Sequence, residues 1–298
     1  MANIQHLTKL KQGSASWTSW LDSQNQPEID LVDANLHGIN LSEAYLVKAN
    51  LSKADLTGVQ LCRANLTGAN LTQVELIDAS LTRANLAGAN LQSAYLIDAN
   101  LNHANLIGAD LRFVLGRGAN FHQANLIGTS IRQARLPQVN FTQAKLNRAN
   151  LSETDLTKAS FDLADLSSAN FYEAELQSAS FYQANLYRVK AIATHLSHSY
   201  LLASNLVEAS LVECDLRWAN LSYTNLQSAN LQRAKLTGAI FTRANLTGAN
   251  LKGANLRGAN LTNANLCKAN LVGADIEDTI FNKACLTETI MPDSSIHH

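Results

Sequence analysis

A leucine recurs at every fifth residue through most of this 298-residue chain. In the stretch from Leu246 to Leu266, each leucine follows an asparagine by one place and an alanine by two. A period of five fits neither a helix, with 3.6 residues per turn, nor a flat strand, which alternates every two residues. We therefore expect each repeat to turn a corner. The leucine (position i) and the alanine (i−2) point inward, i−1 points outward, and i+1 and i+2 form the bend.

Phenylalanines indicate how many repeats make one coil. They replace the central leucine at spacings of twenty residues or multiples of twenty. Rings that stack along one axis would give this spacing, so a coil has four sides. Centres fall at every fifth residue from 31 to 286, which makes 52 repeats and predicts about 13 coils. The phenylalanines on this grid are Phe121, Phe141, Phe161, Phe181, Phe241 and Phe281.

The pattern Ala-[Asn/Asp]-Leu-x-x, as in ANLTG at residues 64–68 and ANLRG at residues 254–258, resembles the repeat of the pentapeptide-repeat proteins. The resemblance extends over nearly the whole chain. It implies an all-β fold, a right-handed quadrilateral parallel β-helix, with i and i−2 lining the interior. It implies little about activity, because most members of the family have no assigned biochemistry.

The pattern divides the chain into three segments. Residues 1–28 precede the repeats and are expected to form a short helical N-terminal cap, with Gly13 ending a first helix and Ser14 or Ser16 capping a second. Residues 29–288 form the β-helix. Residues 289–298 form a C-terminal tail, in which Pro292 cannot extend the strand ladder. The apolar residues at helical spacing in the cap are Ile4, Leu7, Leu10, Trp17, Trp20 and Leu21.

The composition argues against binding of a partner through the overall charge of the protein. The formal net charge is −1, and charged residues make up 16% of the chain. We therefore expect no direct nucleic-acid binding. No apolar run approaches the length of a membrane span, and the N-terminus lacks a signal-peptide core, so we expect no membrane association and a cytoplasmic location.

The four cysteines predict neither a disulfide nor a zinc site. Cys214 takes an inward i−2 position, where it acts as a small hydrophobic residue. Cys62 and Cys267 take i+1, and Cys285 takes i−1. No two share both a face and a repeat position in neighbouring coils, so pairing is not expected.

No catalytic site is expected. Asparagine at i−1 has a local structural explanation, because its amide can bond backbone groups at the corner and stacked copies can bond one another. Familiar catalytic motifs are missing, and a filled coil offers no pocket for convergent polar groups. We expect no enzyme activity and no cofactor. The carboxylates that fill the same structural position are Asp55, Asp155, Asp165 and Asp215.

Two repeats lack a large residue at the centre without shifting the register. Gly116 is one such centre, and we expect the backbone to bulge there so that Leu115 turns inward. Ala191 is the other, with a similar exchange by Ile192. The pattern leaves open whether these breaks are neutral or functional.

Exposed aromatic and basic side chains near the second break are the first candidate for a partner-binding site. Aromatic residues together with arginine are typical of interface hot spots. These residues scatter over all four faces, so they form a belt around the coils. They are Tyr172, Tyr182, Tyr187, Arg188, His195, His198, Tyr200, Trp218 and Tyr223.

Two further surfaces are candidates. Four stacked repeats carry no charge, and their i+1 residues form an outward stripe suited to self-association. A short acidic run on another side is the feature that a DNA mimic would need. A homodimer through the C-terminal coil, at Ile280, Phe281 and Ile290, is also open. The stripe is Thr67, Ala87, Ile107 and Ile127, and the acidic run is Asp55, Glu75, Asp78 and Asp98.

These observations favour a non-catalytic scaffold for an unidentified protein partner. Some pentapeptide-repeat proteins resemble duplex DNA in shape and charge and occupy the DNA-binding groove of type II topoisomerases, so mimicry is the alternative from another class. Such a mimic needs a dense acidic surface, whereas Arg117, Arg135 and other basic residues interrupt the acidic run here. A purely structural rod is the third reading.

Overall fold

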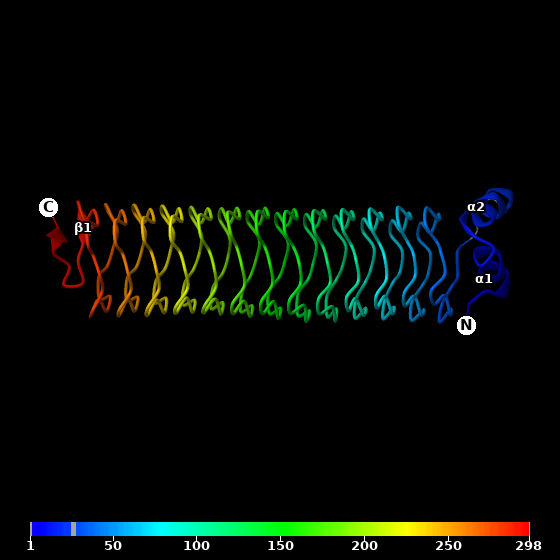
Figure 1. The fold of residues 1–298 in the computed structure, drawn as a ribbon, viewed down its shortest axis with the longest axis horizontal. Helices are drawn as coiled ribbons and strands as arrows, with labels where there is room; N and C mark the ends of the chain where they lie inside the picture. The colour runs from blue at the N-terminus through cyan, green and yellow to red at the C-terminus, as the bar shows by residue number, and fades with distance from the viewer. Residues whose placement is uncertain (1, 25–27, 298) are drawn as a thin grey trace. The chain divides into compact units, whose positions relative to one another are not determined.

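The structure is a computed structural model that describes residues 2–24 and 28–297. The chain divides into two compact units, Met1–Asn150 and Leu151–His298, and each is described by itself. In both units the residues at i−1 form parallel bridges with residues twenty positions away, as Asn65 does with Asn85 and Asn225 with Asn245. Each unit is therefore a four-sided parallel β-helix, and its successive coils lie side by side in Figure 1.

Backbone hydrogen bonds join each repeat to the coils before and after it. The amide of Leu66 donates to the carbonyl of Asn85 (2.7 Å), and the amide of Asn85 donates to Ala64 (2.9 Å). Within the corner, Ala64 donates to the carbonyl of Leu61 (3.1 Å), and Arg63 at i+2 has φ +58°. A positive φ at this place is what a type II turn requires. The corner predicted at i+1 and i+2 is confirmed.

The asparagines at i−1 hold the corners, as the sequence predicts. Asn65 Oδ1 accepts a hydrogen bond from the Thr67 amide (3.2 Å), and Asn105 Nδ2 donates to Asn85 Oδ1 (3.0 Å). Aspartates at i−1 accept in the same way from the residue two places on. Those predicted from the sequence, Asp55, Asp155, Asp165 and Asp215, all do so, and Asp30, Asp110 and Asp275 do as well.

The interior of each unit consists of the residues at i and i−2, which are almost all fully buried. The twenty-residue grid of phenylalanines produces stacked rings. The ring centroids of Phe121 and Phe141 are 5.0 Å apart in the first unit, and those of Phe161 and Phe181 are 4.9 Å apart in the second.

Neither break in the pattern causes the exchange that we expected. Leu115 stays outward and half-buried, because its backbone keeps the regular ladder: its amide donates to the carbonyl of Ala94 (3.0 Å). Leu96 and Leu136, from the neighbouring coils, fill the space beside Gly116. Both the expected bulge and the inward turn are wrong.

Ile192 also stays outward and half-buried, since Ala191 keeps its hydrogen bond to the carbonyl of Ser210 (2.8 Å). The expected exchange by Ile192 is therefore wrong as well. An apolar cavity of about 10 Å³ remains beside Ala191, and Phe171 and Leu211 are among the residues that line it.

Two helices precede the first coil: α1 (Ile4–Leu10) and α2 (Ser14–Ser23). The residue before α2 is Gly13, whose φ of +102° suits glycine, and no serine side chain caps this helix. The predicted cap at Ser14 or Ser16 is therefore wrong. Ile4 is 71% exposed and lies outside the core, whereas Leu10 and Trp17 are fully buried.

The ladder continues past residue 288. The strand β1 (Thr289–Ile290) still pairs with Asn270 in the preceding coil, and β2 (Ile296–His297) folds back antiparallel on β1. Pro292, which was expected not to extend the ladder, has no amide hydrogen to donate, but its carbonyl accepts a hydrogen bond from the Gly273 amide (2.9 Å).

Candidate functional site

Two register relations decide which outward side chains meet. A residue at i+1 lies against the i−1 residue of the next coil, eighteen positions on, as Cys62 Sγ lies 3.2 Å from Ser80 Oγ and Gln92 Nε2 donates to Asp110 Oδ2 (2.8 Å). A residue at i+2 meets the i+2 residue twenty positions on, as Arg188 pairs with Glu208. Candidate sites are built from these two relations.

The first relation corrects the prediction for the cysteines. Cys267 at i+1 and Cys285 at i−1 are eighteen residues apart and form a disulfide, with a Cα–Cα distance of 5.9 Å. A comparison of equal repeat positions in neighbouring coils does not predict this contact, because the two cysteines occupy different positions of the repeat. Cys62 and Cys214 are free; Cys214 is fully buried, and burial raises the pKa of its thiol.

The aromatic candidates lie in the second unit, and part of the belt gathers on one face. On the face of centres Phe161, Phe181, Leu201 and Leu221, the eighteen-residue relation places Tyr182 beside Tyr200. Tyr223 lies at the corner that follows this face, and Trp218 lies at the corner that precedes it. The exposed fractions are 37% for Tyr182, 40% for Tyr200, 59% for Trp218 and 53% for Tyr223. We call these four residues the aromatic patch.

The other predicted members of the belt lie apart from this patch or beside it. Tyr172 is on the face of centre Phe171, and the Glu173 carboxylate that accepts its hydroxyl hydrogen bond raises the pKa of Tyr172. Tyr187 and Arg188 are on the face of centre Leu186, where the guanidinium lies 4.9 Å from the ring centroid. His198 is at the same corner position as Trp218, one coil earlier, and lies two residues before Tyr200 in sequence.

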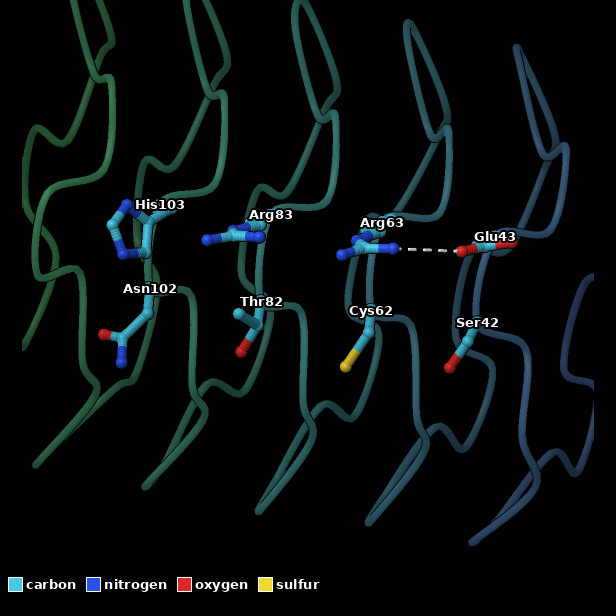
Figure 2. Close-up of a pocket in the computed structure, with 8 residues that line it drawn as sticks. All are labelled: Ser42, Glu43, Cys62, Arg63, Thr82, Arg83, Asn102 and His103. Carbon is cyan, nitrogen blue, oxygen red and sulfur yellow. Dashed lines mark hydrogen bonds and ion pairs between the residues drawn. The ribbon is translucent and has the colours of Figure 1, made fainter.

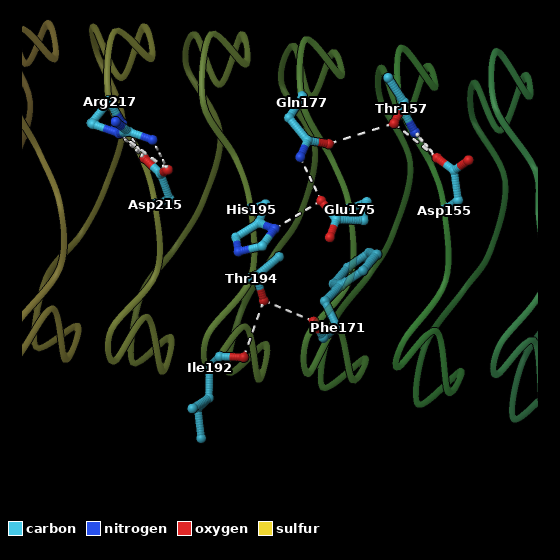
Figure 3. Close-up of polar contacts among 10 residues, drawn as sticks. All are labelled: Asp155, Thr157, Phe171, Glu175, Gln177, Ile192, Thr194, His195, Asp215 and Arg217. Carbon is cyan, nitrogen blue, oxygen red and sulfur yellow. Dashed lines mark hydrogen bonds and ion pairs between the residues drawn. The ribbon is translucent and has the colours of Figure 1, made fainter.

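His195 belongs to a polar chain on the face of centres Leu156, Leu176 and Leu196, which Figure 3 shows. Its Nδ1 lies 2.8 Å from Glu175 Oε2, and Gln177 Nε2 donates to the same oxygen. The Oε1 atom of Gln177 in turn accepts a hydrogen bond from Thr157 Oγ1. Within residues 2–24 and 28–297 no group of three or more His, Cys, Asp or Glu could hold a metal ion.

One coil beyond His195, Asp215 forms a bidentate ion pair with Arg217 (Figure 3). Arg217 Nε donates to Asp215 Oδ1 (2.9 Å), and Arg217 Nη2 donates to Oδ2 (2.6 Å). Burial opposes ionisation of Asp215, but hydrogen bonds from the Arg217 side chain and backbone outweigh it and hold the pKa of Asp215 below its ordinary value.

The acidic candidates lie on the face of centres Leu36, Leu56, Leu76 and Leu96 in the first unit. Asp55 and Glu75 are bridged neighbours at i−1, while Asp78 and Asp98 occupy i+2. The i−1 column then continues through Tyr95 and Leu115 to end in Arg135. The acidic run therefore covers only part of the face.

The uncharged candidates stack on the face of centres Leu46, Leu66, Leu86, Leu106 and Leu126 in the first unit. Each of their amides donates to the Asn two residues before it. Ile107 is 43% exposed, and Thr67, Ala87 and Ile127 are half-buried. Lys48 lies at one end of this face, and Lys145 and Arg148 at the other.

A groove that the sequence analysis did not identify runs along the face of centres Leu41, Leu61, Leu81 and Leu101 (Figure 2). It has a volume of about 480 Å³. Arg63 and Arg83 line it on successive coils, and Arg63 contacts Glu43 at 3.4 Å. The sequence signal that could have identified this groove is the pair Arg63 and Arg83, two basic residues at i+2 that are one coil apart. The other lining residues are Ser42, Cys62, Thr82, Asn102 and His103.

Comparisons with known proteins agree with the repeat pattern. The family model described as pentapeptide repeats matches in overlapping segments that together run from residue 29 to residue 291. The comparison with curated proteins finds no match. In the described residues, neither helix is both long and apolar enough to cross a membrane.

HetL and QnrB1 are among the solved structures that are similar to the chain. HetL, a pentapeptide-repeat protein involved in heterocyst differentiation regulation from the cyanobacterium Nostoc sp. strain PCC 7120, is 36% identical; the alignment covers 70% of this chain and 91% of HetL, with a TM-score of 0.37. QnrB1, a plasmid-mediated fluoroquinolone resistance protein, is 18% identical over 70% of this chain and 91% of its own, with a TM-score of 0.38.

Proposed function

Since the chain belongs to the family of pentapeptide-repeat proteins, with repeats matched from residue 29 to residue 291, we propose that it is a non-catalytic scaffold that binds another protein. Its fold is the right-handed quadrilateral β-helix of that family. Binding would use side chains held in fixed columns, without covalent chemistry.

The aromatic patch carries this proposal. Tyr182, Tyr200, Trp218 and Tyr223 are all more than a third exposed on neighbouring coils of the second unit. Tyrosine and tryptophan offer large contact areas at a small cost in side-chain entropy, and they dominate interface hot spots. The nearby Arg243 stacks on Tyr223 at 5.5 Å and adds a cation to the edge of the patch.

The polar groups elsewhere support a non-catalytic role. The aspartates at i−1 are acceptors for corner amides, and asparagines bond one another between coils. These carboxylates and amides are committed to holding the backbone. The residues inside the coils are mostly apolar and almost all fully buried, which leaves little room for a substrate.

We further propose that residues 1–28 cap the first coil and that the repeats form about 13 coils. Two contacts support the cap. The Asn3 amide donates to the carbonyl of Asp30 (3.1 Å), and the Asp30 amide donates to His6 Nδ1 (3.1 Å). An exposed strand edge invites pairing with other chains, and these two contacts satisfy backbone groups at that edge.

The test compares affinity capture from an extract of the source cells by three forms of the protein. One is the wild type, and one carries Tyr182→Ala, Tyr200→Ala and Trp218→Ala. The control carries Tyr45→Ala, Tyr95→Ala and Phe113→Ala, which removes three exposed aromatic side chains from the first unit. Circular dichroism verifies that all three forms fold.

We expect the wild type and the control to retain the same protein and the patch variant to lose it. Equal retention by all three forms would exclude the aromatic patch as the site. The absence of any specifically retained protein would favour a purely structural role.

A further inference from the structure

We propose that the groove on the Leu41, Leu61, Leu81 and Leu101 face of the first unit binds an acidic, extended segment of a protein. This inference rests on the proposed scaffold function and assigns a second surface, with a partner of stated charge. The aromatic patch lies in the other unit and plays no part in it.

The first step is the shape of the groove. It runs along four successive coils, and each coil contributes one short polar side chain at i+1 and one longer side chain at i+2, in two parallel rows (Figure 2). Neighbouring coils are about 4.8 Å apart, so four coils span roughly 14 Å. An extended chain advances about 3.3 Å per residue, so four or five residues of a peptide match the groove.

The second step is its charge. Arg83 is exposed, and in the described part of the chain it has no ion pair. Arg63 pairs with Glu43 at 3.4 Å, but both side chains are more than 60% exposed, so the pair contributes little and the guanidinium can turn to another carboxylate. Two adjacent arginines in one line favour a ligand with several carboxylates in one line.

The two faces that flank the groove differ in charge: the face of centres Leu56, Leu76 and Leu96 carries the acidic run, whereas the face that follows the arginines is uncharged. Directly after Arg63 and Arg83 the chain turns onto the uncharged face of centres Leu66 and Leu86, where Asn65 and Asn85 point outward. No acidic residue occurs in repeats 64–68, 84–88, 104–108 or 124–128. A partner that lies across this corner meets cations and neutral side chains, with Glu43 as the acid at one end of the groove.

The backbone and side chains of the groove also indicate which kind of acidic polymer it would bind. The ladder amides and carbonyls beneath the groove are bonded to neighbouring coils, as Arg63 N is to Thr82 O (2.9 Å), so a partner cannot join as an added strand. Side chains alone must recognise it. None of the eight lining residues is Phe, Tyr or Trp, and single-stranded nucleic acid usually needs such rings to stack its bases. The groove thus fits an acidic peptide better than a nucleic acid.

Cys62 makes the site directly testable. It lines the groove and is half-buried, whereas Cys214 is fully buried and Cys267 is in the disulfide with Cys285. In the folded protein, a neutral alkylating reagent such as iodoacetamide should therefore modify Cys62 first. A peptide in the groove would shield this thiol.

The experiment measures the binding of fluorescein-labelled hexaglutamate by anisotropy, together with the rate of Cys62 alkylation with and without unlabelled peptide. Arg63→Gln with Arg83→Gln removes the proposed site. The matched control, Arg233→Gln with Lys268→Gln, removes two i+2 cations from the second unit; Arg233 pairs with Glu213 and Lys268 with Glu288, as Arg63 does with Glu43. Glu43→Gln removes the acid from the groove.

At low salt we expect binding to the wild type and the control, and alkylation of Cys62 that is slowed about threefold or more, with both effects lost at high salt. The Arg63/Arg83 variant should show neither effect, and Glu43→Gln should bind more tightly. Hexalysine should not bind.

Three outcomes would overturn the inference: no binding by the wild type, equal binding by the Arg63/Arg83 variant, or hexathymidylate binding and protecting Cys62 as well as hexaglutamate does. The last outcome would assign the groove to polyanions in general. The peptide assay uses purified whole protein and reports on the groove of the first unit. Its failure would therefore not affect the aromatic-patch test, and failure of that capture test would not affect the interpretation of the peptide assay.

Discussion

The indole ring of Trp218 packs over Gly238, the residue at the same corner position in the next coil. A methyl group on Gly238 would lie 2.3 Å from Cε3 and Cζ3 of the ring. Gly238 also has φ +67°, as the corner requires. Glycine here thus serves both the turn and the position of the most exposed ring in the aromatic patch.

Replacing Gly238 with alanine should displace the indole. We expect a greater exposure of Trp218, seen as stronger acrylamide quenching of its fluorescence, and a loss of stability beyond the roughly 1 kcal/mol cost of alanine at positive φ. Gly258→Ala is the control, because Gly258 has φ +63° and open space around its α-carbon. Equal quenching and equal stability in the two variants would show that the ring does not depend on Gly238.

The sequence predicted the fold well because its period and its phenylalanine grid both follow from one repeating geometry. The predictions from the sequence were wrong at repeats whose residues depart from the usual pattern. We expected Leu115 to turn inward because it is apolar, but its backbone is held in the ladder, so the direction of its side chain is set by position and not by hydrophobicity.

The candidate sites were harder to predict than the fold, because they depend on contacts between unequal positions of neighbouring coils. The Cys267–Cys285 disulfide and the contact of Cys62 with Ser80 both follow the eighteen-residue relation. A five-residue period alone does not reveal that relation, because it compares only equal positions of the repeat. Once it is known, it can be applied directly to the sequence.

The cavity beside Ala191 predicts a stabilising substitution. Ala191→Val adds two methyl groups beside an apolar cavity of about 10 Å³ and so fills space that alanine leaves empty. The centre accepts β-branched residues, since Ile131 is fully buried at the equivalent position. We expect a gain of about 0.5–1 kcal/mol in the free energy of unfolding, measured by denaturant titration.

Gly116→Ala is the comparison for Ala191→Val. A methyl group at Gly116 would lie 2.8 Å from Leu136 Cδ2 and 3.2 Å from Leu96 Cβ, so this break offers no free space. It should bring no gain. A loss of stability on Ala191→Val would mean that the cavity is closed in solution.

Two inward serines carry hydroxyl groups that make no hydrogen bond among the described residues. Ser199 Oγ and Ser204 Oγ are both buried at i−2, where alanine is the usual residue. A buried hydroxyl without a partner costs roughly 1–3 kcal/mol, so Ser204→Ala should raise the melting temperature. Thr194 provides the contrast, because its Oγ1 donates to the carbonyl of Phe171 (2.7 Å). Thr194→Val should lower the melting temperature, and a fall with Ser204→Ala would indicate a bound water.

The eighteen-residue relation also predicts where a new disulfide can form. Cys62 and Ser80 have the same register as Cys267 and Cys285, and their side-chain atoms are already 3.2 Å apart. Ser80→Cys should therefore form a disulfide with Cys62 under oxidising conditions. Titration of free thiols in the denatured protein should give one thiol, as against two for the wild type. Thr82→Cys, at the same repeat position as Cys62 in the next coil, is the control and should leave more free thiols than Ser80→Cys does.

Asp215 gives a pH-dependent contribution whose sign follows from its pKa. Because the pKa of Asp215 is lower in the folded protein than in the unfolded chain, its ionised form stabilises the fold above about pH 4, and this contribution is lost as the pH falls through the folded value. Asp215→Asn should therefore reduce the free energy of unfolding at pH 7 by about 1 kcal/mol or less, since Arg217 is half exposed. The difference from the wild type should shrink at pH 3.

Asp155→Asn is the matched control for this last substitution. Asp155 makes the same corner hydrogen bond, to the Thr157 amide (3.1 Å), but in the described residues it pairs with no arginine. Asparagine can accept the corner bond in both variants, so the comparison isolates the ion pair with Arg217. Denaturant titrations at pH 7 and pH 3 should show a pH-dependent difference for Asp215→Asn that is larger than that for Asp155→Asn. Equal differences would assign the effect to the corner carboxylate itself, without a contribution from Arg217.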